Sequence, residues 1–275
     1  ECFDLLAAMN TGHDGSMCTL HANSPRECLG RMENMILMGD IKIPKEAISR
    51  QIAESVDLIV QVKRLRDGSR RSYSMANAPH RQGELLEGDA KGIELHIRHM
   101  PGGKFTDHVF GAMKEKEIQR VEGPQGSFFL REDSDKPLVF LASGTGFAPI
   151  KAILEHMQFK GINRPSVLYW GGRRPQDLYL NDWLQAQLAL MPNLRYVPVI
   201  SDALPEDKWS GRTGFVHQAV LQDHPNLSSF QVYACGAPIV VDSARADYVG
   251  KAGLPEEAYF ADSFTTEADK AKESI

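Results

Sequence analysis

Three glycine-bearing loops in the C-terminal half of the sequence could hold a phosphorylated ligand. Each follows a run of apolar, strand-like residues and precedes a stretch with helical character. The loops are Ser143–Gly146, Trp170–Arg173 and Cys235–Pro238. Glycine lets backbone amides approach a pyrophosphate, and the N-terminus of a following helix adds a partial positive charge. One GxG loop is weak evidence, but three such loops, after the first, second and fourth expected strands, indicate a dinucleotide site.

These loops lie between the strands and helices of an alternating pattern that begins after Asp135-Lys136-Pro137. Strands are expected at 138–142, 166–170, 195–200, 231–235 and 258–260, and helices from about 148 and at 178–190, 214–222 and 238–250. Such alternation predicts a parallel sheet covered on both faces, with ligands at the carboxyl ends of its strands. We therefore expect an α/β, Rossmann-like nucleotide-binding domain over residues 135–275.

The residues before this domain follow other patterns. Apolar residues at helical spacing predict two helices within 25–56. Period-two alternation over 58–62, followed by the turn Asp67-Gly68, predicts a β-hairpin. Residues 93–131 read as strands and loops, interrupted by Pro101-Gly102-Gly103. The expected order is a mainly helical N-terminal segment, a β-rich middle part and an α/β domain.

Composition argues against several classes of partner and site. The 275 residues carry a formal net charge of -5, so no basic field favours nucleic acid or an anionic membrane. The apolar runs fall far short of the roughly 20 residues that span a bilayer, and no signal-peptide pattern opens the sequence. A cytoplasmic location is therefore expected. The four cysteines lack CxxC spacing and the spacing of a plant-type iron–sulfur cluster, so no metal site is expected.

Together with Arg71-Ser72-Tyr73-Ser74, the three loops resemble the ferredoxin-NADP reductase family in order and spacing. The resemblance is closest to its branch of oxygenase reductases and CDP-6-deoxyglucoseen reductase. It implies an NAD(P)H-dependent flavoprotein oxidoreductase, with a partial antiparallel FAD-binding β-barrel at 71–134 and an NAD(P)-binding domain at 135–275. Electrons would pass to a separate acceptor, such as an iron–sulfur protein or an oxygenase.

The resemblance assigns flavin contacts to two segments. Arg71 would meet the pyrophosphate, Tyr73 would stack on the isoalloxazine ring, and Ser74 would hydrogen-bond near its N5 atom. Without the motif, Tyr73 reads as a half-buried strand aromatic. Backbone amides and a hydroxyl of the second segment would cradle the FAD pyrophosphate. The residues expected there are His96, Arg98, Gly102, Gly103 and Thr106.

Nicotinamide contacts fall, by the same resemblance, on the three glycine-bearing loops. The dinucleotide pyrophosphate is expected at Gly144, Thr145 and Gly146, where an added Cβ would occupy the space that the phosphates need. The other two loops contribute Gly171, Arg173, Gly236 and Pro238. The expected catalytic residues are Ser74, Cys235 beside the nicotinamide C4, and Phe260 in the closing strand. Taken alone, Cys235 reads as a small buried hydrophobe, and a core role explains Phe260 nearly as well.

The choice between NADH and NADPH depends on cations that could bind a 2′-phosphate. The third strand ends in Ser201-Asp202 with no adjacent arginine, which favours NADH. Arg173, Arg174 and Arg212 leave NADPH open.

Residues 1–70 depart from the reductase pattern. Ala8–Ser16 and Thr19–Asn23 resemble the C-terminal part of the type II/IV secretion ATPases that drive pilus assembly, in which His13 and His21 would belong to a box near the nucleotide. No GxxxxGK[ST] loop occurs, so ATP hydrolysis is not expected. The two resemblances imply a composite, either a rearranged reading frame or a deliberate chimera, whose flavin barrel lacks its first strands. They leave open a secretion-ATPase fragment that acts as an assembly module, and a nicotinamide binder without turnover.

Overall fold

The computed structural model describes residues 71–81, 92–119, 121 and 123–264, together with a few positions between 33 and 49. The chain divides into two compact units, one of residues 1–70 with 113–126 and the other of 71–112 with 127–275. In the first unit, the described positions 33, 34, 36 and 47–49 are helical, within the range predicted for two helices. The predicted turn at Asp67-Gly68, His13 and His21 lie outside the described residues.

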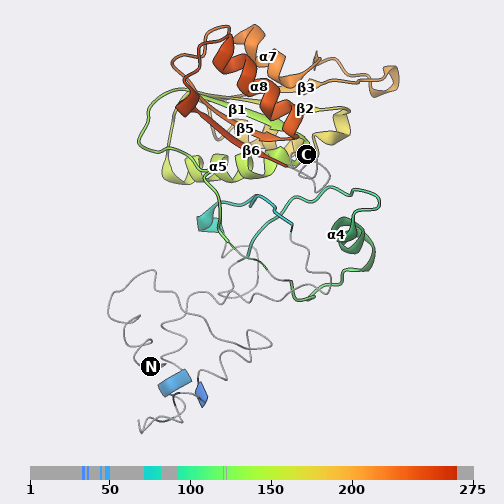
Figure 1. Ribbon diagram of the computed structural model, residues 1–275, viewed down its shortest axis with the longest axis vertical. Coiled ribbons are helices and arrows are strands. Elements are labelled where there is room, and N and C mark those ends of the chain that lie inside the picture. The colour runs from blue at the N-terminus through green and yellow to red at the C-terminus, as the bar shows by residue number, and fades with distance from the viewer. Residues whose placement is uncertain are drawn as a thin grey trace, which may run out of the picture. The chain divides into compact units, whose positions relative to one another are not determined.

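A six-stranded sheet forms the centre of the second unit (Figure 1). Its order is β4-β3-β2-β1-β5-β6, and every neighbouring pair is parallel. The strands are β1 (Leu138–Ser143), β2 (Ser166–Gly172), β3 (Leu194–Ile200), β4 (Arg212–Thr213), β5 (Gln231–Gly236) and β6 (Tyr259–Ser263). The chain moves outward from β1 to β4 and then returns to the other side of β1 at β5. A crevice for ligands is expected at this reversal, at the carboxyl ends of β1 and β5.

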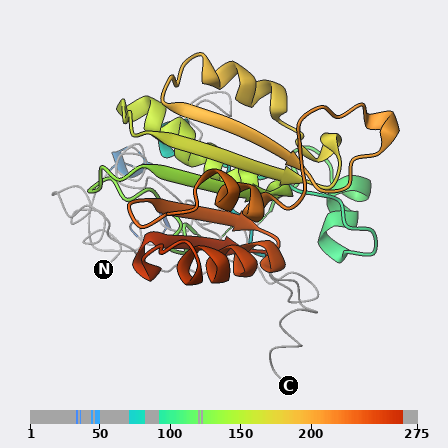
Figure 2. The ribbon, with the colours of Figure 1, turned by 90° about the horizontal axis from the view of Figure 1, so that it is seen from above.

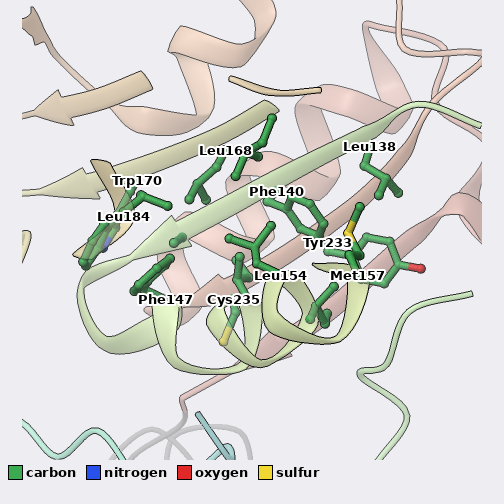
Figure 3. Packing of buried hydrophobic residues seen from close by; sticks show 14 of the residues in the cluster. Leu138, Phe140, Phe147, Leu154, Met157, Leu168, Trp170, Leu184, Tyr233 and Cys235 are labelled. Carbon is green, nitrogen blue, oxygen red and sulfur yellow. The ribbon is translucent and has the colours of Figure 1, made fainter. Parts of the chain in front are cut away.

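Helices cover both faces of the sheet, as Figures 1 and 2 show. They are α5 (Phe147–Lys160), α6 (Asn181–Leu188), α7 (Val216–Asp223) and α8 (Pro238–Gly250). Along β1 and β2, alternate residues enter opposite cores: Phe140 and Trp170 pack toward α5 (Figure 3), and Val139 and Tyr169 pack toward α7 and α8. Burial on both faces explains why the strands read as continuous apolar runs. The predicted α/β class is confirmed, and β4 is a strand that the sequence pattern did not indicate.

The second unit also contains the two segments that carry the expected flavin residues. Extended residues 71–78 lead into a 3-10 turn, η1 (Pro79–Arg81), and an antiparallel bridge joins Met75 to Leu95. Residues 92–100 lead through a turn into α4 (Lys104–Asp107) and a π-helical turn, η2 (His108–Ala112). Residues 82–91 of this part lie outside the description.

No described helix is both long and apolar enough to cross a bilayer. Within the same residues, no group of three or more His, Cys, Asp or Glu side chains is arranged to hold a metal ion.

Candidate functional site

The glycine turn after β1 touches the end of β5 through backbone atoms. Residues Gly144–Gly146 form a 3-10 turn, η3, and a Cβ added at Gly146 would lie 2.1 Å from the carbonyl oxygen of Cys235. Gly236 has φ +141°, and its added Cβ would lie 2.7 Å from the Ser143 carbonyl oxygen. Only glycine permits this approach, so these two glycines bring the ends of β1 and β5 together at the sheet reversal.

The same turn fits an anionic ligand on its open side. Gly144 has φ +53°, and the nearest atom to an added Cβ there is Arg98 Nη1, at 4.0 Å. The Trp170 indole donates a 2.9 Å hydrogen bond to the Gly144 carbonyl, and its ring stacks on Phe147 at 4.1 Å (Figure 3). Among the described residues, no side chain caps the N-terminus of α5, which follows directly. A fixed glycine turn, a helix N-terminus and a guanidinium suit a phosphate group.

Ser74, Cys235 and Asp262 meet at the carboxyl end of β5 and β6. The Ser74 hydroxyl donates a 2.6 Å hydrogen bond to Asp262 Oδ2, and Cys235 Sγ lies 3.9 Å from the same oxygen. Cys235 and Asp262 are register partners on the two strands. Burial raises the pKa of the Cys235 thiol well above its ordinary value, and the Asp262 carboxylate adds to this shift. The thiol therefore stays protonated beside one carboxylate and one hydroxyl.

Asp262 was missed by sequence reasoning. Its signal was an acidic residue inside the apolar closing segment Tyr259–Phe264, but its partners depend on the register of β6 against β5.

Phe260 lies farther down β6, away from this cluster. It is the register partner of Tyr233, and the two rings are 4.7 Å apart. The Arg131 guanidinium lies over the Phe260 ring, 4.4 Å from the ring centre. Two residues along a strand correspond to roughly 7 Å, so Asp262 and not Phe260 is level with Cys235. Phe264, whose amide donates to the Gly236 carbonyl at 2.9 Å, is an aromatic just beyond that level.

The expected flavin-stacking residue, Tyr73, lies on the first flavin segment two residues after Arg71. Its ring is 5.6 Å from that of Phe105. Burial raises the pKa of Tyr73, with a smaller opposing effect from Arg71, so the phenol is neutral. The ring is half-buried and keeps an accessible part that a flavin could contact.

The expected pyrophosphate turn at Gly102 and Gly103 is closed by its own hydrogen bonds. The Thr106 hydroxyl donates to the Met100 carbonyl at 2.9 Å, and Asp107 Oδ2 accepts from the Gly102 amide at 3.0 Å. A Cβ at Gly103 would lie 2.7 Å from Thr106 Oγ1, so a close turn accounts for that glycine. Phosphate binding at this turn would compete with the Asp107 carboxylate for the Gly102 amide.

His96 contacts Glu94 and Tyr179 and not the expected pyrophosphate turn. Its Nε2 lies 2.7 Å from Glu94 Oε1, and its Nδ1 lies 2.5 Å from the Tyr179 hydroxyl. Burial lowers the pKa of His96, against an opposing effect of Glu94, which favours the neutral ring. His96 thus links the second flavin segment to the residues that precede α6.

The end of β2 and the loop that follows it pack against α7 and form ion pairs with an aspartate. A Cβ at Gly171 would lie 2.7 Å from the Val216 side chain, so this glycine lets α7 approach the strand. Arg173 is exposed and lies 3.9 Å from Asp202, which is also 4.0 Å from Arg174. The third loop ends at Pro238, the first residue of α8, where proline suits the helix start.

Two family models match different parts of the chain. An oxidoreductase NAD-binding domain matches residues 140–246, which contain the sheet reversal and the glycine turn. A type II/IV secretion system protein model matches residues 1–96.

Similar proteins are reductases. The CDP-6-deoxy-L-threo-D-glycero-4-hexulose-3-dehydrase reductase of Yersinia pestis is 42% identical over 228 residues, which cover 82% of this chain and 63% of that protein. The NAD(P)H-flavin reductase of Aliivibrio fischeri is 30% identical over 71% of this chain and 80% of its own length. The crystal structure of an Amycolatopsis cytochrome P450 reductase superposes with a TM-score of 0.62 and 31% identity, covering 73% of this chain and 58% of that one. The chain thus spans less than two thirds of the first relative's length.

Proposed function

The chain belongs to the ferredoxin-NADP reductase-like family of NAD-binding oxidoreductases, and from this membership we propose that it transfers hydride from NADH to FAD and passes electrons to a separate acceptor protein. The observation that carries the proposal is the meeting of Ser74, from the flavin motif, with Cys235 and Asp262, from the nucleotide-binding sheet. A flavin and a nicotinamide must be adjacent for hydride transfer, and these residues come from the two segments that would hold them.

The redox chemistry itself, hydride transfer between a nicotinamide and a flavin ring, is supplied by the bound cofactors. The protein's share is to position the rings, to exclude water and to control protons. Asp262 fixes the direction of the Ser74 hydroxyl through their 2.6 Å hydrogen bond. Cys235 is buried and protonated, so it places no charge where hydride must pass.

Each cofactor has a set of proposed contacts. The dinucleotide would be held by Gly144, Thr145, Gly146 and the N-terminus of α5. The flavin would be held by Arg71 and Tyr73, with Arg98 near the glycine turn. The position of Phe264, beyond the end of β6, supports it rather than Phe260 as the aromatic that covers the reacting rings.

NADH is the proposed donor rather than NADPH. The Asp202 carboxylate lies 3.9 Å from Arg173 and 4.0 Å from Arg174, and Arg174 also contacts Asp207 at 3.1 Å. These acids partly neutralise the two arginines that could receive a 2′-phosphate, and they would repel it.

A second candidate function concerns the N-terminal part. The secretion-system model matches residues 1–96, and this range overlaps the first flavin segment. We propose association with secretion-ATPase subunits as the alternative activity of this part. The acceptor of electrons, whether an iron–sulfur protein or an oxygenase, and the cytoplasmic location also stay predictions.

An absorption spectrum of the purified full chain tests the main proposal. FAD is added in excess, free flavin is removed, and the spectrum is recorded before and after anaerobic addition of NADH. We expect retained flavin bands that bleach with NADH and return with air. Failure to retain FAD, or bands that bleach with dithionite but not with NADH, would contradict the proposal.

A further inference from the structure

Two oppositely charged side chains on α5 are buried and take no part in the chemistry proposed above. Lys151 and Glu155 are each 4% exposed, and they form an ion pair of 2.7 Å across one helical turn. Burial of charge costs free energy unless every charge is paired and hydrogen-bonded. The helix therefore requires partners for both groups at this face.

Those partners come from the two flavin segments. Lys151 Nζ donates to the Ala76 carbonyl at 2.9 Å and contacts Glu94 Oε2 at 3.0 Å. Glu155 accepts from the Ala78 amide at 3.0 Å and from Arg81 Nη1 at 2.6 Å.

The charges in this cluster balance, with two cations and two carboxylates. Burial alone raises the pKa of Glu94, but hydrogen bonds from His96 and Lys151 outweigh it and leave the pKa below its ordinary value. Beside Lys151, the Trp183 ring of α6 lies 5.2 Å from Nζ. Within the described residues, each charged group of the cluster thus has a hydrogen-bond or ion-pair partner. These contacts depend on direction and distance.

The two flavin segments that Lys151 and Glu155 contact are also hydrogen-bonded to each other. The Asn77 side chain donates to the Gly92 carbonyl at 3.2 Å and accepts from the Glu94 amide at 2.9 Å. The Ala76 amide donates to the Glu94 carbonyl at 2.8 Å. Movement of one segment must therefore carry the other, and Ser74 lies only two residues before Ala76.

The N-terminus of α5 adjoins the glycine turn Gly144–Gly146. The helix begins at Phe147, directly after Gly146, and Lys151 follows one turn later, about 6 Å along the axis. The expected nucleotide loop thus leads directly into the helix that contacts the flavin segments through Lys151 in its second turn and Glu155 in its third.

We propose that Lys151 and Glu155 form an ionic latch that sets the position of the Ser74 segment against the glycine turn, and that they are positioning residues for hydride transfer. The kinetic part rests on the proposed function, whereas the latch itself does not. A buried ion pair can often be replaced by apolar residues with little loss of stability. Its directional bonds to the Ala76 carbonyl and the Ala78 amide have no apolar substitute.

Hydrogen exchange of the full chain without cofactor tests the latch. In Lys151→Met, we expect exchange in the peptide covering 71–81 to accelerate at least tenfold, while exchange in 138–143 of β1 stays within twofold. The matched control is Glu132→Gln, which removes an exposed partner of His156 on the same helix and should change neither peptide. Unchanged exchange at 71–81, or equal acceleration in both peptides, would overturn the latch.

Flavin reduction tests the positioning role. In Lys151→Met with bound FAD, the limiting rate of bleaching by NADH should fall at least tenfold, with half-saturation by NADH within threefold of the parent. The double variant Lys151→Met/Glu155→Met removes both buried charges, so it should unfold at a higher midpoint than Lys151→Met but should not regain the parent's rate. Recovery of the rate would show that the charges serve stability alone. If NADH does not reduce the parent, the proposed function fails, and hydrogen exchange decides the latch by itself.

Discussion

The Ser74 hydroxyl donates a 2.6 Å hydrogen bond to the Asp262 carboxylate across 188 positions of the chain. Ser74 belongs to the extended segment that begins at Arg71, and Asp262 belongs to the edge strand β6. Because Cys235 Sγ lies 3.9 Å from the same carboxylate oxygen, one acidic group orders both residues that we expect at the reacting rings.

Asp262→Asn should slow flavin reduction by NADH at least tenfold and change FAD affinity by less than threefold. The amide keeps an acceptor for Ser74 but removes the negative charge beside Ser74 and Cys235. Stopped-flow measurement of flavin bleaching at saturating NADH gives the rate. Asp242→Asn on the exposed side of α8 is the control and should behave like the parent. An unaltered rate in Asp262→Asn would remove Asp262 from the proposed site.

Tyr73→Ala should weaken FAD binding by roughly ten- to a hundredfold, on the order of 1–3 kcal/mol, because a stacking face is lost. Tyr73→Phe keeps the ring and its 5.6 Å contact with Phe105, so it should bind FAD within about threefold of the parent. Fluorescence titration of the flavin measures both. Equal affinities in all three proteins would mean that Tyr73 is a packing residue of its segment.

Gly146→Ala should lower the free energy of unfolding by about 1–3 kcal/mol, the usual cost of overpacking. Its Cβ would lie 2.1 Å from the Cys235 carbonyl oxygen, so the strain falls on the backbone of β5 and not, as the sequence pattern suggested, on ligand space. Gly144→Ala has room, and its φ of +53° costs roughly 1–2 kcal/mol of conformational strain. Urea unfolding with and without NADH compares them, and we expect the greater loss of NADH affinity in Gly144→Ala.

Stability should fall as the pH drops below about 6.5. Burial is the main cause that lowers the pKa values of His96, His217 and His224 from the ordinary value of 6.5. Below pH 6.5 these histidines bind protons more readily in the unfolded chain than in the folded chain. Their contribution to the free energy of unfolding is therefore complete above pH 6.5 and is lost as the pH falls toward the folded pKa values. Urea unfolding between pH 7.5 and about 5 measures the decline. His224→Gln should make it shallower, and an identical slope would contradict the assignment.

Asp202→Ser should improve the use of NADPH at least tenfold relative to NADH. The substitution frees Arg173 and Arg174 from a carboxylate 3.9 and 4.0 Å away and removes a negative charge that would face a 2′-phosphate. The ratio of kcat/KM for the two nucleotides, with ferricyanide as acceptor, is the measurement. An unchanged ratio would mean that the adenosine part of the nucleotide does not bind beside Arg173 and Arg174.

The sequence by itself determined the architecture of the C-terminal domain. Strand and helix periods are local, and glycines after apolar runs mark strand ends, so the parallel sheet and the turn at Gly144–Gly146 could be predicted without tertiary knowledge. Ser74 and Cys235 could be proposed only from the resemblance of their short motifs to the reductase family.

The tertiary structure decided which residues share the site. The register of β6 on β5 places Asp262 level with Cys235 and leaves Phe260 beside Tyr233, and no local pattern encodes that register. Lys151 and Glu155 look like solvent-facing helix residues until segments more than 50 positions away cover them. Such pairings depend on which distant surfaces become buried together, because a charge is stable inside a protein only where its partners converge.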